Sequence, residues 1–254
     1  MANLIQPSRG GGGHFYTKDG DAVEGGLREA RKVGAFPSVT TVMGCAKNYG
    51  LENYKREQFG LALLTLNRKK GETDDEFIAR ADLDANDQSA KAMEKGTHIH
   101  NLWENIDSVI GENTLDEKRI EIMRDWKAEN ILKIEQSESV VVSQAYGFAG
   151  RFDTLARVKD GTKDGELMLL DLKTSDPKGK KLKPWESYCM QLSAYSLALG
   201  MDVACANIMF NSTDKPEILF HRWERSEIEE ARGGFLGVLA YWQWANNYRP
   251  QDVG

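Results

Sequence analysis

The stretch Glu166–Thr174, Glu-Leu-Met-Leu-Leu-Asp-Leu-Lys-Thr, organises the interpretation of the whole sequence. Its apolar run 167–170 follows the turn signal Asp164-Gly165, a pattern typical of a strand buried on both faces. Because side chains alternate along a strand, we expect Asp171 and Lys173 on the same face. Such a charge pair is costly to bury unless it is paired or binds a metal. An acid and a lysine two residues apart, taken alone, favour a structural ion pair over a catalytic site.

The order of sequence patterns predicts the architecture. We expect helices at 51–70, 86–110 and 114–132, strands at 138–142, 148–158 and 167–173, a helix at 184–199, strands at 203–211 and 217–223, and a helix at 226–246. Strands 148–158 and 167–173 are expected to form a hairpin. This order predicts an α/β or α+β fold, with a central mixed β-sheet flanked by helices. We expect three segments: a flexible tail at 1–13, an N-terminal helical extension at 14–87 and a catalytic core at 88–250.

The composition excludes several classes of protein. No run of eighteen apolar residues and no secretion signal is present, so the expected location is the cytoplasm, or the cytoplasm of a bacterial host if the chain is phage-encoded. Cys45, Cys189 and Cys205 are odd in number and form no CxxC pair. A disulfide framework, a zinc knot and an iron-sulfur cluster are therefore not expected.

The net charge of -6 conceals an uneven distribution. Residues 72–87 hold seven acids and one arginine, which accounts for the whole net charge. From Gly147 to Lys183 there are nine lysines or arginines and six acids. A basic surface beside an acidic site is what a metal-dependent enzyme acting on phosphates requires.

Five polar side chains are expected at element ends that face one end of the sheet: His100, Glu138, Asp153, Asp171 and Lys173. Hard oxygen ligands suit Mg²⁺, and one imidazole makes Mn²⁺ an easy substitute. An ion between Asp153 and Asp171 would hold a phosphate oxygen and activate water. Lys173 would position or help deprotonate that water and offset developing charge. This set predicts phosphodiester hydrolysis.

Four motifs then carry a family resemblance. Gly96-x-x-x-His100, Gly150-Arg-Phe-Asp153, Leu170-Asp-Leu-Lys-Thr174 and Gln191-x-x-x-Tyr195 occur in this order. Together they resemble the motifs of the RecB-like branch of the PD-(D/E)XK nuclease superfamily, over roughly residues 88–246. The Pro37-Ser-Val-Thr segment and the single-domain size are also similar to the mitochondrial genome maintenance exonuclease and its phage relatives.

The resemblance implies a restriction-endonuclease-like core and a set of metal ligands. By this resemblance His100, Asp153, Asp171 and the main-chain carbonyl of Leu172 would ligate the metal, and Lys173 would be the catalytic lysine.

Three further roles are implied by the resemblance. Glu138 would approach a second metal or the attacking water, and Gln191 and Tyr195 would support the substrate backbone through hydrogen bonds. For Gln191 and Tyr195 a buried polar pair that closes a helix against the sheet explains the sequence equally well.

The sequence departs from the superfamily in three ways. The residue before Asp153 is Phe152, whereas the name of the superfamily has proline at this position. Members of the RecB-like branch often lack that proline. The four cysteines of the iron-sulfur members are missing, so that cofactor is not expected. No G-x-x-x-x-G-K-[ST] motif is present, so helicase activity is not expected on this chain.

These observations predict a Mg²⁺- or Mn²⁺-dependent DNA exonuclease that acts on single-stranded DNA or free duplex ends. It would serve phage or bacterial recombination, replication or repair, with proteins of those processes as partners. The predicted phosphate contacts are Arg151, Lys178, Lys180, Lys181 and Lys183, although such residues are more often simply solvated. Two alternatives remain: an endonuclease on DNA or RNA with the same core, and a catalytically silent nucleic-acid-binding protein.

Overall fold

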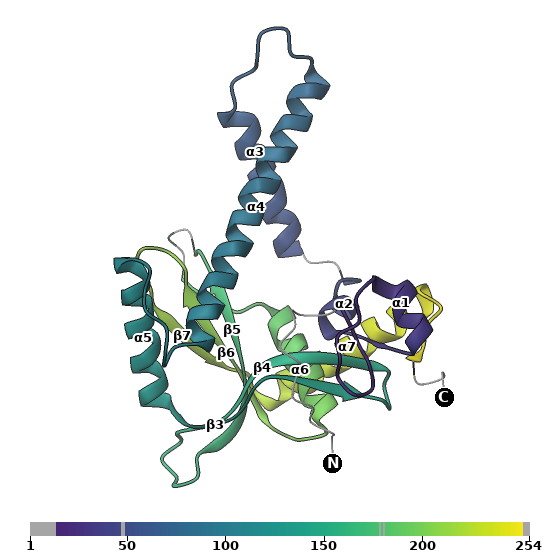
Figure 1. Ribbon diagram of the computed structural model, residues 1–254, viewed down its shortest axis with the longest axis vertical. Helices are drawn as coiled ribbons and strands as arrows, with labels where there is room; N and C mark the ends of the chain where they lie inside the picture. Colours follow the sequence, from purple (N-terminus) through teal and green to yellow (C-terminus); the bar gives the residue numbers. More distant parts are fainter. Residues whose placement is uncertain (1–13, 47–48, 178, 180, 251–254) are drawn as a thin grey trace. The chain divides into compact units, whose positions relative to one another are not determined.

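The computed structural model describes residues 14–46, 49–177, 179 and 181–250. The chain divides into two compact units, which we call the sheet unit (Met1–Ala46 with Ile110–Gly254) and the helical unit (Lys47–Val109). Figure 1 shows the elements of each. Within the described ranges, no helix has the length and apolar character needed to cross a membrane.

The helical unit consists of α3 (Tyr49–Thr65) and α4 (Asp74–Glu104), which pack against each other. The hydroxyl of Thr73 accepts a hydrogen bond from the Glu76 amide, and the Glu76 carboxylate accepts one from the Thr73 amide. This capping box starts α4 inside the acidic stretch, where negative charge also favours a helix N-terminus. The expected helix at 86–110 therefore begins twelve residues earlier, at Asp74.

The sheet unit is built on five strands in the order β3-β4-β5-β6-β7. The strands are β3 (Ile131–Ser143), β4 (Phe148–Val158), β5 (Glu166–Ser175), β6 (Ala204–Asn211) and β7 (Ile218–Arg222). All neighbours pair antiparallel except β5 and β6, which are parallel. The predicted hairpin of β4 with β5 and the predicted fold class, a mixed sheet flanked by helices, are confirmed.

Three long helices belong to the sheet unit. The parallel pair β5 and β6 requires a crossover, which α6 (Glu186–Leu199) supplies before Gly200 ends it in the left-handed conformation, with φ 63°. Helix α7 (Arg225–Ala245) packs on α6, and α5 (Thr114–Asn130) leads directly into β3 (Figure 1). Leu192 of α6, Phe235 of α7 and Leu169 of β5 are each fully buried in one apolar core.

Two helix starts differ from the expected positions. Helix α5 is capped by Asn113, whose side-chain oxygen accepts hydrogen bonds from the amides of Leu115 and Asp116, and not by Thr114. Helix α7 is preceded by Glu224 and not by Ser226. At α5 the side chain of Asn113 satisfies two free amides of the first turn, and at α7 the carboxylate of Glu227 accepts a hydrogen bond from the Glu224 amide at 2.8 Å.

The first described segment belongs to the sheet unit. It contains β1 (Phe15–Tyr16), α1 (Gly26–Val33), β2 (Phe36–Pro37) and α2 (Val39–Met43). Ser38 forms an isolated bridge with Ala149 of β4, and Val39 and Val42 are fully buried. Residues 14–46 thus belong to the sheet unit, whereas residues 88–104 lie in α4 of the helical unit. The division at residue 88 stays a prediction.

Candidate active site

The two middle strands of the sheet part at a pair of acids. β4 and β5 pair from Val158↔Glu166 to Thr154↔Leu170, and the next residue on each strand is Asp153 or Asp171. Beyond that point β4 stays with β3 as far as Ser143↔Phe148, while β5 stays with β6 as far as Ser175↔Asn211. We call this place the fork. The register of the hairpin therefore brings the two predicted metal-binding carboxylates to the same level of the sheet.

A side chain bridges the fork where backbone pairing has stopped. The Leu172 amide donates a hydrogen bond to Oδ2 of Asp153 at 2.9 Å. Because the N–H and C=O of one strand residue point to the same neighbour, the Leu172 carbonyl also faces β4. Asp153 and the main chain of Leu172 thus meet where the two strands separate, and Asp171 directly precedes Leu172 in β5.

Asp171 is a buried carboxylate with charged and neutral donors. Its side chain is 1% exposed, and Nζ of Lys173 lies 2.9 Å from Oδ1 and 2.8 Å from Oδ2. The Asn207 amide donates to Oδ2 at 2.8 Å. The alternation argument is confirmed in its geometry, because Asp171 and Lys173 face the same side and pair. A buried carboxylate needs such partners to offset its desolvation.

Lys173 is an ammonium in this arrangement. Burial has the largest single influence on its pKa and would lower it, but attraction by Asp171 and then Asp153, with the hydrogen bond to Asp171, outweighs burial. The pKa of Lys173 is consequently raised above its ordinary value. The ring of Tyr188 adds a cation–π contact, with Nζ 5.4 Å from the ring centroid.

Helix α6 closes the back of the site. Nε2 of Gln191 donates to the hydroxyl of Tyr195 at 3.0 Å, and Tyr195 is buried. Burial first, and then the charges of Asp171 and Asp153, raise the pKa of Tyr195. A Cβ atom at Gly150 would lie only 2.5 Å from the Tyr195 ring, so glycine permits this close approach of α6 to β4. A contact of Gln191 and Tyr195 with substrate stays a prediction.

Glu138 occupies the third strand at the same level. It lies between the pairs Ser137↔Thr154 and Ser139↔Phe152, so the register sets it opposite Asp153. Its backbone is left-handed, with φ 48°, which is a strained conformation for a residue with a side chain.

The Glu138 carboxylate is directed to Arg151. Oε2 of Glu138 lies 3.1 Å from Nε of Arg151. Two predicted site residues are therefore paired with each other: Glu138, which is expected near a second metal, and Arg151, which is expected to bind a DNA phosphate.

The remaining predicted site residues belong to other segments of the chain. His100 lies on α4 in the helical unit, and its role as a metal ligand stays a prediction. Lys181 and Lys183 are exposed in the loop between β5 and α6, whereas Lys178 and Lys180 fall outside the described residues.

The fork offers oxygen donors of the kind that Mg²⁺ and Mn²⁺ prefer. Across residues 14–46, 49–177, 179 and 181–250, no three His, Cys, Asp or Glu side chains gather closely enough to hold an ion. Two carboxylates and a main-chain carbonyl still fit magnesium, because this ion keeps several waters and takes one or two carboxylates. Asp153, Asp171 and Leu172 are therefore the residues that would hold it.

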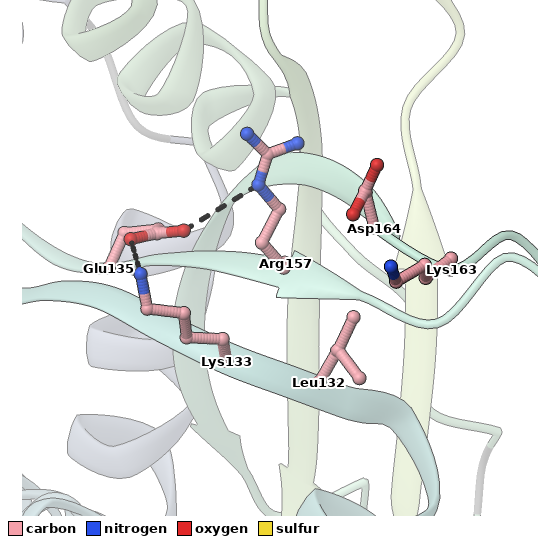
Figure 2. Close-up of a pocket in the computed structure, with 6 residues that line it drawn as sticks. All are labelled: Leu132, Lys133, Glu135, Arg157, Lys163 and Asp164. Atoms are coloured by element: carbon pink, nitrogen blue, oxygen red, sulfur yellow. Dashed lines mark hydrogen bonds and ion pairs between the residues drawn. The ribbon is translucent and has the colours of Figure 1, made fainter.

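A hollow elsewhere on the sheet lacks this chemistry. It has a volume of about 510 Å³. Figure 2 shows the residues that line it: Leu132, Lys133, Glu135, Arg157, Lys163 and Asp164. Two of its cations share one carboxylate: Nζ of Lys133 lies 2.6 Å, and Nε of Arg157 3.6 Å, from Glu135 oxygens. The hollow contains none of the predicted site residues, so the fork remains the candidate active site.

Comparisons with known proteins bear on the fold. No family model and no curated protein matches the sequence. A solved protein from Eubacterium rectale, described as a candidate exonuclease, aligns with a TM-score of 0.50 at 12% identity, over 89% of this chain and 86% of its own. The two chains share a fold. That common fold is the mixed five-stranded sheet with its flanking helices.

Two further solved structures align less closely. The alkaline exonuclease LHK-Exo from Laribacter hongkongensis aligns with a TM-score of 0.36 at 15% identity, over 84% of this chain and 91% of its own. The same protein in complex with dAMP aligns with a TM-score of 0.40 at 15% identity, over 86% and 93%.

Three residues that contact Lys173 or Asp171, directly or through one other side chain, carry no motif in the sequence: Tyr188, Asn207 and Trp223. Tyr188 is three positions from Gln191, which places both on one helical face. Asn207 is a lone amide inside the apolar run Ala204–Phe210 of a buried strand, and such a residue needs a partner. That lone amide is the signal that could have identified Asn207.

Proposed function

We propose that the chain is a Mg²⁺- or Mn²⁺-dependent deoxyribonuclease that hydrolyses phosphodiester bonds at free DNA ends. The observation that carries the proposal is the fork, where Asp153 and Asp171 stand at one level beside the Lys173 ammonium. Two carboxylates on adjacent strands with a lysine two residues after the second form the donor set expected for phosphodiester hydrolysis.

The proposal includes the RecB-like branch, similarity to the mitochondrial and phage exonucleases, and a role in recombination, replication or repair. The family motifs Gly150–Asp153 and Leu170–Thr174 support it, because each contains one of the two carboxylates at the fork. The shared fold is consistent with it.

Each residue at the fork has a proposed task. Asp153, Asp171 and the Leu172 carbonyl would hold the ion, with His100 as the further ligand that the family resemblance implies. When bound, the ion neutralises the carboxylates, polarises a phosphate oxygen and lowers the pKa of a coordinated water. Lys173 offsets negative charge that develops on the phosphate, as a fixed ammonium does best when it is partly removed from water.

The proposed contact of Arg151 with DNA competes with an ion pair inside the protein. For Arg151 to bind a DNA phosphate, its ion pair with Glu138 must open or be shared, because the Glu138 carboxylate lies 3.1 Å from Nε. Glu138 would then be released toward Asp153, opposite it in the register. Lys178, Lys180, Lys181 and Lys183 are proposed to hold the phosphate backbone through charge alone.

Digestion of linear and closed circular DNA, single- and double-stranded, tests the proposal with Mg²⁺, Mn²⁺ and EDTA. Linear DNA should be degraded with either ion and not with EDTA, and closed circles should survive. Asp171→Asn should abolish cleavage. Asp160→Asn, an exposed acid in the turn of the same hairpin, is the matched control and should retain it.

Three outcomes would count against separate parts of the proposal. Cleavage by Asp171→Asn would remove the site. Loss of closed circles would remove the requirement for an end and favour the endonuclease. If no DNA is cleaved but RNA is degraded, the substrate is RNA and not DNA.

A further inference from the structure

A line of buried hydrogen bonds leads from Asp171 across two neighbouring strands. Asp171 of β5 pairs with Asn207 of β6, and Asn207 pairs with His221 of β7. The Asn207 amide donates to Oδ2 of Asp171 at 2.8 Å and to the Asp171 carbonyl at 3.3 Å. Nε1 of Trp223 donates to Oδ1 of Asn207 at 2.7 Å. Asp171, Asn207 and Trp223 are all buried, so these bonds lie within the protein interior.

The chemistry of the three groups sets the direction of this line. An indole N–H can only donate, an ionised carboxylate can only accept, and a carboxamide does both through different atoms. With its oxygen bound to Trp223, the Asn207 side chain must present its NH₂ to Asp171. The reverse orientation would put oxygen against a carboxylate and NH₂ against an N–H.

Trp223 is itself held on both sides. Its amide donates to the Cys205 carbonyl at 3.0 Å, which ties the residue to β6. The ring of His221 packs edge-on against the indole, with centroids 4.5 Å apart. These two contacts hold the indole in the position from which its N–H donates to Asn207.

We propose that Asn207 and Trp223 are positioning residues that fix the orientation of the Asp171 carboxylate. Trp223 acts only through Asn207, because its donor sets which end of the carboxamide faces Asp171. This inference rests on the proposed function in one respect: it takes Asp171 as the carboxylate that the reaction uses.

Substitution of Trp223 with phenylalanine isolates the donor, because most of the ring volume remains. Removing a partner of a metal-binding side chain usually costs about 10–100-fold in activity or metal affinity. We expect Trp223→Phe to lower kcat on linear DNA by about that factor, with KM for DNA unchanged. Direct calorimetric titration with Mn²⁺ alone should show a comparable loss of affinity.

Trp242→Phe is the matched control. Trp242 is buried in the same unit, and among the described residues its indole N–H makes no hydrogen bond. It should lose a similar amount of thermal stability and keep its kcat and Mn²⁺ affinity.

A double-mutant cycle separates a relay from two independent effects. Asn207→Leu should lower kcat at least as much as Trp223→Phe, and the double variant should be no slower than Asn207→Leu alone. Multiplied losses in the double variant would overturn the proposal, as would an unaltered kcat and Mn²⁺ affinity in Trp223→Phe.

An NMR measurement keeps the inference testable without activity. The side-chain NH₂ protons of Asn207 should exchange slowly with solvent and should shift and exchange faster in Trp223→Phe. If the native protein cleaves no DNA, the proposed function fails, and these signals alone decide the relay. Unchanged Asn207 signals in Trp223→Phe would overturn the proposed relay. This test does not require that Asn207→Leu folds.

Discussion

Replacement of Gly150 by alanine should weaken the packing of α6 on β4. The added Cβ would lie 2.5 Å from Cε1 and 3.2 Å from Cδ1 of Tyr195, and 3.1 Å from Cγ2 of Val39. Ordinary contact begins at 3.4 Å, so the Tyr195 ring must retreat by nearly an ångström. The ring is 3% exposed and its hydroxyl bonds to Gln191, so it has no free space to enter.

The magnitude follows from two opposing effects. Overpacking of this kind destabilises the folded state by about 1–3 kcal/mol. Alanine also restricts the unfolded chain more than glycine does, which favours folding by about 0.4–1 kcal/mol. The free energy of unfolding should therefore fall by about 1–2 kcal/mol. With a urea slope of about 2–3 kcal/mol/M, the unfolding midpoint should fall by roughly 0.5 M.

Tryptophan fluorescence during urea unfolding measures this change in the relevant unit, because five of the six tryptophans lie outside Lys47–Val109. Gly237→Ala is the control: it lies inside α7 with no atom within 4 Å of the added Cβ. It should stabilise the protein by about 0.5–1 kcal/mol, since alanine is the better helix former. An unchanged or raised midpoint for Gly150→Ala would refute the close contact.

Four other measurements test the site and the core. Lys173→Met should slow DNA cleavage at least about 100-fold, because the fixed positive charge is lost; near-native rates would exclude its catalytic role. Native protein should have one thiol that reacts fast with Ellman's reagent at pH 8, that of the exposed Cys45. Burial raises the pKa of Cys189 and of Cys205 to about 12, so neither forms much reactive thiolate at pH 8. Three fast-reacting thiols would contradict the burial of these two cysteines. EDTA should stop cleavage, and excess Mg²⁺ or Mn²⁺ should restore it; activity in EDTA would exclude metal dependence. Replacing the four lysines of the 178–183 loop by serine should reduce the slope of log affinity against log salt by about 0.7 for each lost phosphate contact on single-stranded DNA, and an unchanged slope would show that the loop does not touch phosphate.

Local patterns in the sequence determined the strand and helix elements near the fork. Alternation in Glu166–Thr174 placed Asp171 and Lys173 on one face, and the turn signal at 164–165 paired this strand with 148–158. Helical spacing placed Gln191 and Tyr195 together. These features depend on residues close in the chain, so the period of the pattern is enough to predict them.

Contacts between distant residues were decided only by the tertiary structure. The bond of Asn207 to Asp171 spans 36 residues, and the attachment of residues 14–46 to β4 spans more than a hundred. The level of Glu138 relative to Asp153 depends on the β3–β4 register, which a one-residue shift would change. Such contacts follow from which strands become neighbours, and that choice reflects the burial of the whole core rather than any local run of residues.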